Sequence, residues 1–473
     1  MELRGKLVLV LGLGESGLAM ARWCERRGAR VRVADTRPAP PYLDVLRTAA
    51  GGAEFRVSDF NEKFDKSLLA GIDLVALSPG LSGGMMAVIH ARAAGLPVVG
   101  EIELFAWGLR DLGLRHTSRV LAITGTNGKT TTTALTAHLC SARGVPALAC
   151  GNISPAALTA LMDAQDEGRL PRVWVLELSS FQLETLESLC PDAATVLNVS
   201  DDHLDRYIDL DEYAEVKSRI FIGEGVQVLN RDDARVKRMA RDMRSIISFG
   251  LDAPADEEDF GLRVNRGEPW IVQGDQFLLP VSALPMAGLH NAANAMAALA
   301  LCDAVDFDPV SMLPGLRSFK GLPHRVEKVD DFGGIDWYDD SKGTNVGATL
   351  AAINGLGPTL NAKAGAKIVL ILGGDGKGQD FTPLLDAVKH YVRAVILIGR
   401  DGPRIGVVLV DSGVPLLAAT DMEDAVQLCV REALPGDAVL LSPACASLDM
   451  FRNYAHRAEV FIGAVQRLRQ ETQ

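Results

Sequence analysis

A glycine-rich loop ending in Gly-Lys-Thr is the part of this sequence that points most directly to chemistry. It follows the apolar run Val120–Thr124, opens a helical pattern, and reads Gly125, Thr126, Asn127, Gly128, Lys129, Thr130 and Thr131. In such a loop, backbone N–H groups bind phosphate oxygens, the lysine supplies a cation, and the Thr hydroxyl can ligate Mg²⁺. Ile123 stands where a strict Walker A motif has its first glycine. The loop predicts an ATP or GTP site.

A second glycine loop lies near the N-terminus, in Gly12-Leu13-Gly14-Glu15-Ser16-Gly17. This G-x-G-x-x-G spacing, between a predicted strand and a predicted helix, lets a pyrophosphate sit on helix-terminal N–H groups. Asp35 ends the next strand, where dinucleotide-binding proteins place a ribose-binding acid, and Arg37 could contact a phosphate or a base edge. The loop favours a nucleotide without specifying which one. The alternative is that its glycines only close a turn.

The presence of two phosphate-type loops bears on the class of reaction. An NAD-dependent oxidoreductase would use the first loop and leave Gly-Lys-Thr unexplained, because hydride transfer has no use for it. A nucleotide-controlled binding module would use Gly-Lys-Thr as a switch. A phosphoryl-transfer enzyme with a nucleotide-bearing second substrate uses both loops. We favour this last interpretation.

Two polar segments follow predicted strands in the middle of the chain. Glu177 lies at the end of the strand Val173–Leu178, where a carboxylate would hold Mg²⁺ against a nucleotide; a helix cap or an ion pair is the alternative. His203 follows the strand Ala194–Asn198 and has acidic neighbours, which favours a metal or phosphate role over a structural one. The segment with His203 therefore favours a metal or phosphate ligand, and the position of Glu177 fits either interpretation equally.

These groups are placed by short apolar runs that alternate with helical patterns, which predicts βαβ units and parallel sheets. We expect three α/β domains, at residues 1–107, 108–321 and 322–473. The segment Asp252–Gln276, which has several Asp, Glu, Gly and Pro residues, predicts an irregular or antiparallel insertion at a sheet edge. The other expected strands are Lys6–Leu11, Arg30–Ala34, Leu74–Ser78, Lys367–Leu372, Ala394–Ile398 and Ala438–Ser442, and the expected helices are Gly17–Arg27, Lys129–Arg143 and Asn291–Ala304.

Composition narrows the class of protein further. The 473 residues include 48 Lys and Arg against 60 Asp and Glu, a net charge of -12, which argues against nucleic acid or an anionic membrane as the main partner. Hydrophobic residues make up 48% and charged residues 23%, which excludes wholesale disorder. The seven cysteines form no C-x-x-C pair, and no apolar run approaches the roughly 18 residues of a membrane span. The run Leu7–Leu13 fits a strand better than a signal peptide, so we expect a soluble cytoplasmic protein.

Eight motifs, in this order, resemble the Mur ligase family and span nearly the whole chain. They are the loop at 125–131, Glu-Leu-Ser-Ser-Phe-Gln-Leu at 177–183, Asp-Asp-His-Leu-Asp-Arg-Tyr at 201–207, Gly-Leu-His-Asn at 288–291, Leu-Pro-His-Arg-Val-Glu at 322–327, Asp-Asp-Ser-Lys-Gly-Thr-Asn at 339–345, Gly-Gly-Asp-Gly-Lys at 373–377 and Leu-Ser-Pro-Ala-Cys-Ala-Ser-Leu-Asp at 441–449. The resemblance implies a three-domain α/β fold with Rossmann-like N- and C-terminal domains around a central P-loop-type ATPase domain. It is greatest to the member that adds D-glutamate. Sibling Mur or folylpolyglutamate-type ligases share the ATP loop but not Asp-Thr-Arg at 35–37 together with the run at 441–449.

The resemblance implies an ATP-dependent, ADP-forming ligase that adds D-glutamate to UDP-N-acetylmuramoyl-L-alanine. The γ-phosphoryl group moves to the substrate carboxylate, and the amine attacks the acyl phosphate. Phosphorylation is needed because the leaving group of a free carboxylate would be oxide, and cations must neutralise the anions brought together. The resemblance further implies two Mg²⁺ ions and a cytoplasmic monomer in peptidoglycan synthesis, hence in cell wall biogenesis, cell division and cell shape. We expect the third domain to close on ATP and the uridine substrate.

The resemblance also implies roles for matching positions. For catalysis and metal binding these are Lys129, Thr130, Glu177, His203 and Lys217, the last as a carbamylated lysine, although by sequence alone it is a helix-surface lysine. For ATP they are residues 125–131 with Asn291, Arg325, Asp340 and Lys342. For the uridine substrate they are Gly14, Glu15, Ser16, Asp35, Thr36, Arg37, Ser78, Gly80, Asn152 and His203. For the amino acid they are Lys342, Thr344, Lys377, Ser447, Leu448 and Tyr454, where the family pattern commonly has Phe at the last position.

Overall fold

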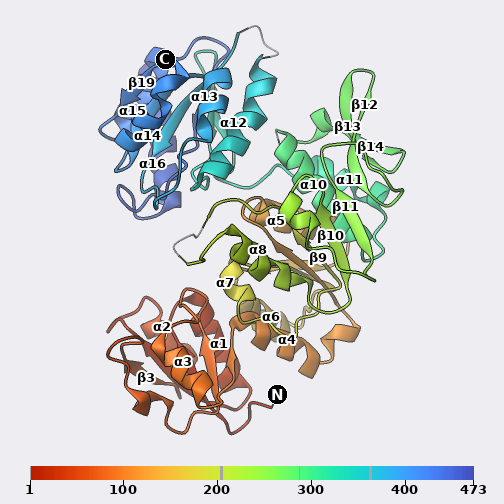
Figure 1. The fold of residues 1–473 in the computed structure, drawn as a ribbon, viewed down its shortest axis with the longest axis vertical. Coiled ribbons are helices and arrows are strands. Elements are labelled where there is room, and N and C mark those ends of the chain that lie inside the picture. Colours follow the sequence, from red (N-terminus) through yellow and green to blue (C-terminus); the bar gives the residue numbers. More distant parts are fainter. Residues whose placement is uncertain (1, 203–205, 287, 362–364, 473) are drawn as a thin grey trace.

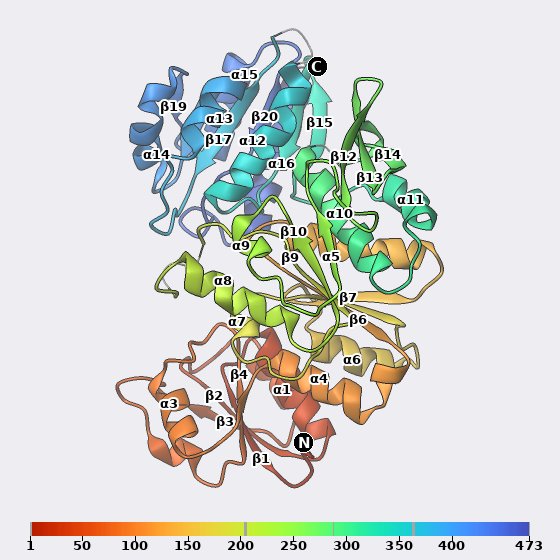
Figure 2. The same cartoon turned by 45° about the vertical axis from the view of Figure 1, so that its right-hand side comes forward.

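The chain is arranged around three β-sheets that follow one another along the long axis of the molecule (Figure 1). The computed structural model describes residues 2–202, 206–286, 288–361 and 365–472. The N-terminal sheet (red to orange) and the C-terminal sheet (blue) lie at opposite ends, with the central sheet between them in both views (Figures 1 and 2). The expected α/β class with parallel sheets is confirmed.

The first sheet has five parallel strands in the order β3-β2-β1-β4-β5. Leu11 pairs with Ala34 on one side and with Leu77 on the other, so the glycine turn, Asp35 and Ser78 all follow strands at the same edge. Ligands of open α/β sheets bind at this carboxyl edge. The elements are β1 (Leu7–Leu11), α1 (Glu15–Arg26), β2 (Arg30–Asp35), α2 (Leu43–Ala49), β3 (Glu54–Val57), β4 (Leu74–Leu77), α3 (Met86–Ala93), β5 (Val98–Val99) and α4 (Glu101–Asp111).

The central sheet has nine strands in the order β14-β13-β12-β11-β10-β9-β6-β8-β7. The antiparallel insertion expected at an edge is confirmed as β12, β13 and β14. Ile123 pairs with Glu177 and Thr124 with Val196, so β6, β8 and β9 end side by side. The elements are β6 (Arg119–Thr124), α5 (Lys129–Ala142), β7 (Ala147–Gly151), α6 (Ala157–Asp166), β8 (Val173–Glu177), α7 (Ser180–Leu183), β9 (Ala193–Val196), α8 (Leu210–Ser218), β10 (Val226–Asn230), α9 (Ala234–Lys237), β11 (Ile246–Phe249), β12 (Phe260–Asn265), β13 (Glu268–Gln273), β14 (Gln276–Pro280), α10 (Leu289–Asp303) and α11 (Pro309–Ser318).

The third sheet has six strands in the order β15-β16-β20-β17-β18-β19, and only the β15–β16 pair is antiparallel. Its central strands are fully buried because helices cover both faces, as parallel sheets require. The elements are β15 (Glu327–Phe332), β16 (Ile335–Asp339), α12 (Val346–Asn361), β17 (Ile368–Gly373), α13 (Leu384–Tyr391), β18 (Val392–Ile398), α14 (Gly402–Leu409), β19 (Leu416–Ala418), α15 (Met422–Glu432), β20 (Ala438–Leu441) and α16 (Tyr454–Thr472).

The first two sheets share one hydrophobic core. Trp23 of α1, Phe105 of α4 and Trp174 of β8 belong to the same buried cluster, and the rings of Phe105 and Trp174 meet edge to face at 5.2 Å. A Cβ on Gly108 would lie 2.8 Å from the Trp23 ring and 2.9 Å from Leu161, so only glycine allows α4 to pack this closely. Residue 107 falls inside α4, which belongs to this shared core. The N-terminal and central parts therefore pack as one unit.

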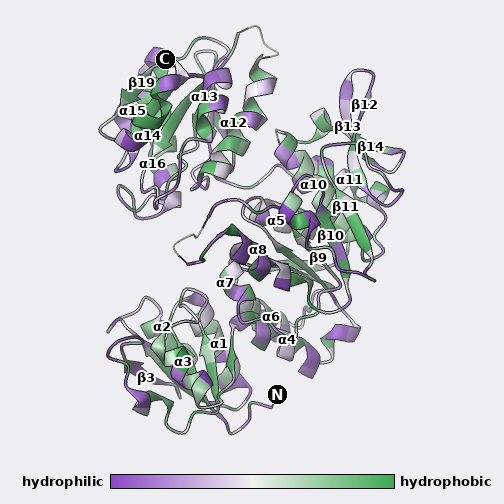
Figure 3. Ribbon diagram, in the orientation of Figure 1, coloured by the Kyte–Doolittle hydropathy of each residue, from purple (hydrophilic) through white to green (hydrophobic). Residues whose placement is uncertain are grey.

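The third sheet builds its own core. The two buried clusters on its faces consist of residues from Ile335 onward. In Figure 3 its strands are mainly in the hydrophobic colour, whereas its helices carry both hydrophobic and hydrophilic residues. This part meets the central part through polar contacts as well as through α10 and α12. Among the described residues, no helix is both long and apolar enough to cross a membrane.

Candidate active site

The loop between β6 and α5 closes on the chain that leaves β9. Gly125 has φ +146° and Gly128, which caps α5, has φ +83°, a region that glycine adopts without strain. A Cβ on Gly125 would lie 3.0 Å from the Cβ of Leu197. The loop thus presents the N-terminus of α5, whose first N–H groups have no partner within the helix and are suited to anions.

Asparagine side chains lock this loop to the end of β9. Asn198 Oδ1 accepts from the Asn127 N–H at 2.8 Å, and Asn198 Nδ2 donates to the Asn127 carbonyl at 3.1 Å. Thr126 Oγ1 donates to the Ser200 carbonyl at 3.2 Å. The phosphate loop and the polar segment after β9 therefore move together, as their assignment to one site requires. His203 lies outside the described residues.

Lys129 is folded onto its own loop. Its Nζ donates to the carbonyls of Gly125 and Thr126, both at 2.8 Å. Burial lowers the pKa of this ammonium group, while the negative charges of Glu177 and Asp202 oppose the shift. The cation is thus held at the loop, where a phosphate would sit.

Lys217 is buried, and the expectation of a helix-surface lysine is wrong. It is 1% exposed, its Nζ donates to the Gly125 carbonyl at 3.0 Å, and the ammonium lies 4.3 Å from the centre of the Tyr213 ring. Burial, reinforced by the positive charge of Lys129, puts the pKa of Lys217 well below its ordinary value. The face of α8 that carries Lys217 packs toward the phosphate loop, and nothing in the local sequence signals this.

Glu177 has one engaged and one unengaged carboxylate oxygen. Its Oε1 accepts from Asn152 Nδ2 at 2.9 Å, and its carbonyl accepts from the Asn152 N–H at 2.8 Å. Its Oε2 is buried and has no hydrogen-bond partner among the described residues. A buried carboxylate oxygen left in this state is costly unless a ligand satisfies it, and a hard divalent cation is the ligand it fits.

The first glycine loop and its neighbours form a second cradle. Asp35 Oδ2 accepts from the Leu13 N–H at 2.8 Å, and Arg37 donates to both Asp35 oxygens at 2.9 Å. Burial alone would raise the pKa of Asp35, but these hydrogen bonds outweigh it and lower the pKa to about 2. Thr36 and the Arg37 side chain remain exposed. A permanent carboxylate with an exposed guanidinium beside it can present both acceptors and donors to a base edge.

The turn after β4 closes the same cradle. Ser78 Oγ donates to the Gly12 carbonyl at 2.8 Å. A Cβ on Gly14 or Gly80 would meet no atom within 4 Å, so both glycines border open space. Ser16 lies partly exposed in the first turn of α1. Gly14, Ser16, Ser78 and Gly80 are thus brought to one edge of the first sheet.

Glu15 makes a different contact from the one its motif suggests. Its Oε1 accepts from Ser154 Oγ at 2.9 Å and from the Ala156 N–H at 3.2 Å, both in the central part of the chain. The glycine loop is therefore tied directly to the chain between β7 and α6, which also carries Asn152. This contact fixes the two cradles relative to one another.

Within the described ranges, two side chains of the third part are hydrogen-bonded to the phosphate loop. Arg325 Nη2 donates to Thr130 Oγ1 at 2.7 Å, and Asn345 Nδ2 donates to Asn127 Oδ1 at 3.3 Å. Burial lowers the pKa of Arg325, and Asp340 and Glu177 oppose that shift. A positive charge from the third domain thus lies against the loop.

A cavity of about 950 Å³ lies between the central and third parts. The central part lines it with the phosphate loop, at Gly128 and Thr131, and with Asn291 of α10. The third part lines it with Arg325 and Asp340. Asp340 Oδ2 accepts from Ser442 Oγ at 2.6 Å, and burial raises the pKa of Asp340 to about 7. The size and the polar rim suit a nucleoside.

The residues expected around the amino acid lie on loops of the third part. Lys342 Nζ lies 3.9 Å from the centre of the Tyr454 ring, and the Thr344 N–H donates to the Lys342 carbonyl at 2.9 Å. Asp375 and Ala446 form a backbone bridge, which joins the Lys377 loop to the loop that carries Ser447 and Leu448. Lys377 has φ +51°, and Leu448 is 72% exposed. These residues form two neighbouring groups at the carboxyl edge of the third sheet.

Some residues of the site were not singled out from the sequence. Asn198 and Asn345 both hydrogen-bond to Asn127 of the phosphate loop. The ring of Tyr213 contacts the Lys217 ammonium. His324 Nδ1 is hydrogen-bonded to the buried Asp339 at 2.7 Å. All but Tyr213 lie inside or next to the quoted motifs, so the motifs were the available signal.

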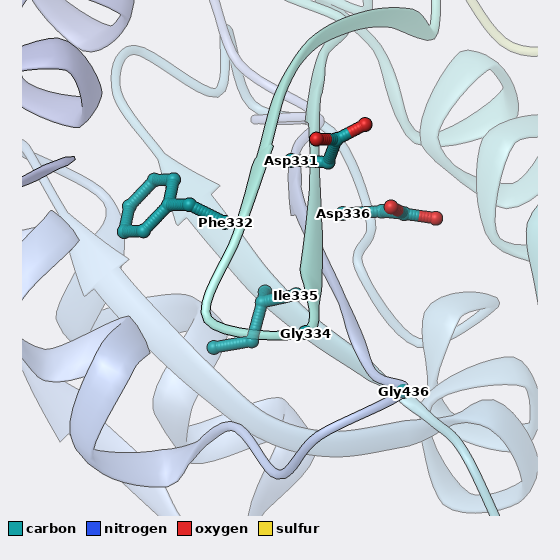
Figure 4. A pocket seen from close by; sticks show the side chains of 6 residues that line it. All are labelled: Asp331, Phe332, Gly334, Ile335, Asp336 and Gly436. Carbon is teal, nitrogen blue, oxygen red and sulfur yellow. The ribbon is translucent and has the colours of Figure 1, made fainter.

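A separate hollow of about 340 Å³ lies at the turn of the β15–β16 hairpin (Figure 4). It is lined by Asp331, Phe332, Ile335 and Asp336, with two glycines. Both aspartates already pair with Lys328 at 3.0 Å. None of the expected site residues lines this hollow.

Three family models match consecutive parts of the chain. They are the Mur ligase MurD-like N-terminal domain at residues 6–100, the Mur ligase middle domain at 123–302 and the Mur ligase glutamate ligase domain at 324–445. The chain belongs to the Mur ligase family.

Two relatives resemble it over nearly their full length, and both are named UDP-N-acetylmuramoylalanine--D-glutamate ligase. The protein from Aromatoleum aromaticum is 59% identical, over 98% of this chain and 98% of its own length. The protein from Dechloromonas aromatica is 56% identical, over 99% of this chain and 100% of its own length. Among solved structures, UDP-N-acetylmuramate-alanine ligase MurC from Thermotoga maritima matches with a TM-score of 0.60 at 20% identity, covering 98% of this chain and 99% of that one. MurF from Acinetobacter baumannii matches with 0.61 at 17% identity, covering 97% and 91%. These structures share the three-part fold.

Proposed function

We propose that this chain is an ATP-dependent ligase that forms the amide bond between D-glutamate and UDP-N-acetylmuramoyl-L-alanine, in the synthesis of peptidoglycan precursors in the cytoplasm. The proposal is carried by two contacts of the central part. Its phosphate loop is bound by the third part, where Arg325 donates to Thr130. Its segment between β7 and α6 is bound to the N-terminal cradle, where Ser154 donates to Glu15. A loop in this position can bring a triphosphate to a carboxylate held by the first part and to an amine held by the third.

Each substrate has a place in this arrangement. The triphosphate binds the loop at 125–131, and its nucleoside occupies the cavity lined by Asn291 and Asp340. The uridine diphosphate binds the N-terminal cradle at the first glycine loop, with the base at Asp35, Thr36 and Arg37. The muramoyl-alanine arm then extends past Asn152 toward Glu177, and the resemblance assigns His203 to the same substrate. The amino acid binds at Lys342, Thr344, Lys377, Ser447, Leu448 and Tyr454.

The reaction follows from these positions. A carboxylate oxygen of the alanine attacks the γ-phosphorus and the bond to ADP breaks. Lys129 and Arg325 offset the negative charge that would otherwise keep the two anions apart. The neutral amine of the amino acid then attacks the acyl carbon, gives one proton to solvent and keeps the other as the amide N–H, while the C–O bond to phosphate breaks. The products are the amide, ADP and phosphate.

Thr130 and Glu177 would hold one Mg²⁺, and His203 and a carbamylated Lys217 would support a second. The buried, unpaired Oε2 of Glu177 fits such an ion. When bound, Mg²⁺ would neutralise phosphate charge and orient the γ-phosphoryl group. The carbamate of Lys217 would form because burial favours its neutral, nucleophilic amine.

The dehydrogenase alternative is disfavoured by the phosphate loop at 125–131. Hydride transfer has no use for a Gly-Lys-Thr loop. In this chain, Arg325 of the third part and the buried Lys217 both contact that loop. The monomeric state and the domain boundaries at 107 and 321 stay predictions.

Phosphate release measured with purified protein, ATP and Mg²⁺ tests the proposal. We expect release only when UDP-N-acetylmuramoyl-L-alanine and D-glutamate are both present, and far less with L-glutamate. Release with either substrate alone, or a change in NADH absorbance without release, would contradict it.

A further inference from the structure

Arg206 joins the central part of the chain to the turn that closes the N-terminal cradle. Its Nη2 donates to the Leu81 carbonyl at 3.0 Å, and its Nη1 lies 3.5 Å from the Pro79 carbonyl. These two carbonyls flank Gly80, an expected contact of the uridine diphosphate. One guanidinium therefore holds both sides of the turn.

The turn held by Arg206 packs on the first glycine loop. A Cβ on Gly12 would lie 2.9 Å from Leu81 and 3.1 Å from Ser78, and Ser78 donates to the Gly12 carbonyl. Movement of Leu81 would therefore change the shape of the loop that faces the diphosphate. Arg206 acts on that loop through the turn and has no contact with it among the described residues.

Glu184 fixes Arg206 from the central part. Glu184 Oε1 accepts from Arg206 Nε at 3.1 Å, and Oε2 accepts from Nη2 at 2.7 Å, which is a two-point contact. Tyr207 Oη donates to Glu184 at 2.9 Å, and the Phe181 ring lies 4.2 Å under the guanidinium. The Arg206 and Glu184 side chains are only 15% and 21% exposed, so solvent screens this pair less than a surface pair.

The sequence positions of the pair connect it to the reacting groups. Glu184 comes at the end of the segment that begins at Glu177, and Arg206 follows His203 by three residues. Each of the two segments that carry an expected metal ligand therefore also carries one residue of this pair. Neither residue of the pair is among those expected to touch a substrate or a metal.

We propose that Arg206, oriented by Glu184, is a positioning residue that sets the uridine-substrate cradle in register with the phosphate loop, so that the substrate carboxylate lies in line with the γ-phosphate. This inference rests on the proposed function. A planar guanidinium suits this position because its fork bonds both oxygens of Glu184 and still reaches the two carbonyls, whereas the ammonium of lysine lacks the fork that matches a carboxylate at two points.

Steady-state kinetics of Arg206→Ala, Arg206→Lys and Glu184→Gln, with each substrate varied in turn, test the inference. For Arg206→Ala we expect kcat/KM for UDP-N-acetylmuramoyl-L-alanine to fall about 30- to 100-fold, with KM for ATP unchanged within about twofold. Arg206→Lys should recover only part of the loss. Glu184→Gln should have little further effect in the Arg206→Ala background, because the two residues act as a unit.

Arg26→Ala is the matched control. Arg26 of α1 also makes an ion pair between the N-terminal and central parts, with Asp166 of α6 at 2.7 Å. The side chains of this pair are far more exposed than those of Arg206 and Glu184. We expect the kinetics of Arg26→Ala to match the wild type within about twofold. Unfolding temperatures of all variants report whether a loss comes from poor folding.

Three results would overturn the inference: Arg206→Ala with unchanged kinetics, a parallel rise in KM for ATP, or an equal loss in Arg26→Ala. Failure of the proposed function is seen separately, because the wild type would then release no phosphate with both substrates present. In that case the inference falls with it.

Discussion

Lys129 and Lys217 donate to the same acceptor, the carbonyl oxygen of Gly125, at 2.8 and 3.0 Å. Two ammonium groups on one oxygen in a buried place repel each other, and the charge of Lys129 helps to lower the pKa of Lys217. The arrangement is favourable when an anion lies beside Lys129 or when Lys217 loses its charge. The proposed reaction supplies both, a triphosphate at the loop and a carbamate on Lys217.

The first prediction concerns Lys129. Lys129→Ala should lower phosphate release by about 10²- to 10³-fold or more, because the cation that offsets transferring phosphoryl charge is lost. Binding of UDP-N-acetylmuramoyl-L-alanine, measured by calorimetry, should remain. The exposed Lys389→Ala serves as the control. Equal loss of turnover and uridine-substrate binding would mean that the two nucleotide sites have been misplaced.

The second prediction concerns the modification of Lys217. Burial and the charge of Lys129 lower the pKa of Lys217, so a larger share of its amine is neutral than in an ordinary lysine, and a neutral amine can add CO₂. In a solution with ¹³C-bicarbonate, the NMR spectrum of the wild type should show one carbamate signal. The variant Lys217→Arg should lose both this signal and the activity. Below the pKa of Lys217 the amine is protonated, so signal and activity should fall together as the pH drops. A full-activity protein without a carbamate signal would refute this role.

The third prediction concerns Asp340 and pH. Burial raises the pKa of its carboxyl from 3.8 to about 7, so its contribution to stability is full below pH 4 and is lost as the pH rises through 7. Between pH 4.5 and 7.5, the free energy of unfolding of the wild type should fall relative to Asp340→Asn, on the order of 2–4 kcal/mol. Burial also raises the pKa of Glu101 to about 7. Glu101 is present in the wild type and in Asp340→Asn, so its effect on the free energy of unfolding cancels in the difference between them. Parallel stability curves would contradict the prediction.

The fourth prediction concerns closure of the third part. Arg325 is its charged contact with the loop, so Arg325→Ala should raise KM for ATP about 10- to 100-fold and increase the radius of gyration measured by solution scattering. Uridine-substrate binding should not change. The exposed Arg317→Ala, on α11, is the control. In the wild type, we expect ATP and the uridine substrate together to make the molecule more compact. An envelope that stays the same in every state would count against closure.

Much of the fold was predictable because its signals are local. Apolar runs such as Val120–Thr124 and Val173–Leu178 are observed as β6 and β8 to within a residue at each end, and α5 begins at Lys129 as expected. The antiparallel edge was signalled by the composition of Asp252–Gln276, because glycine and acidic residues interrupt the pattern of buried parallel strands.

What could not be predicted depends on contacts between distant segments. The burial of Lys217 follows from how α8 packs on the phosphate loop, 92 residues away in sequence at Gly125. The contact of Glu15 with Ser154 and the role of Arg206 at Leu81 likewise join parts of the chain that share no local pattern. Glu15 and Arg206 lie in motifs and Lys217 was assigned by the resemblance, but only the packing assigned the partners of all three.

If the substrate carboxylate is activated by accepting the γ-phosphoryl group, one of its own oxygens must leave with the phosphate. A reaction of UDP-N-acetylmuramoyl-L-alanine carrying ¹⁸O in its alanine carboxylate with ATP, Mg²⁺ and D-glutamate measures this transfer. We expect one ¹⁸O atom in each released phosphate, because the oxygen that attacks phosphorus stays bonded to it when the C–O bond breaks. Released phosphate without ¹⁸O, in a reaction that still forms the amide, would show that the carboxylate is not phosphorylated.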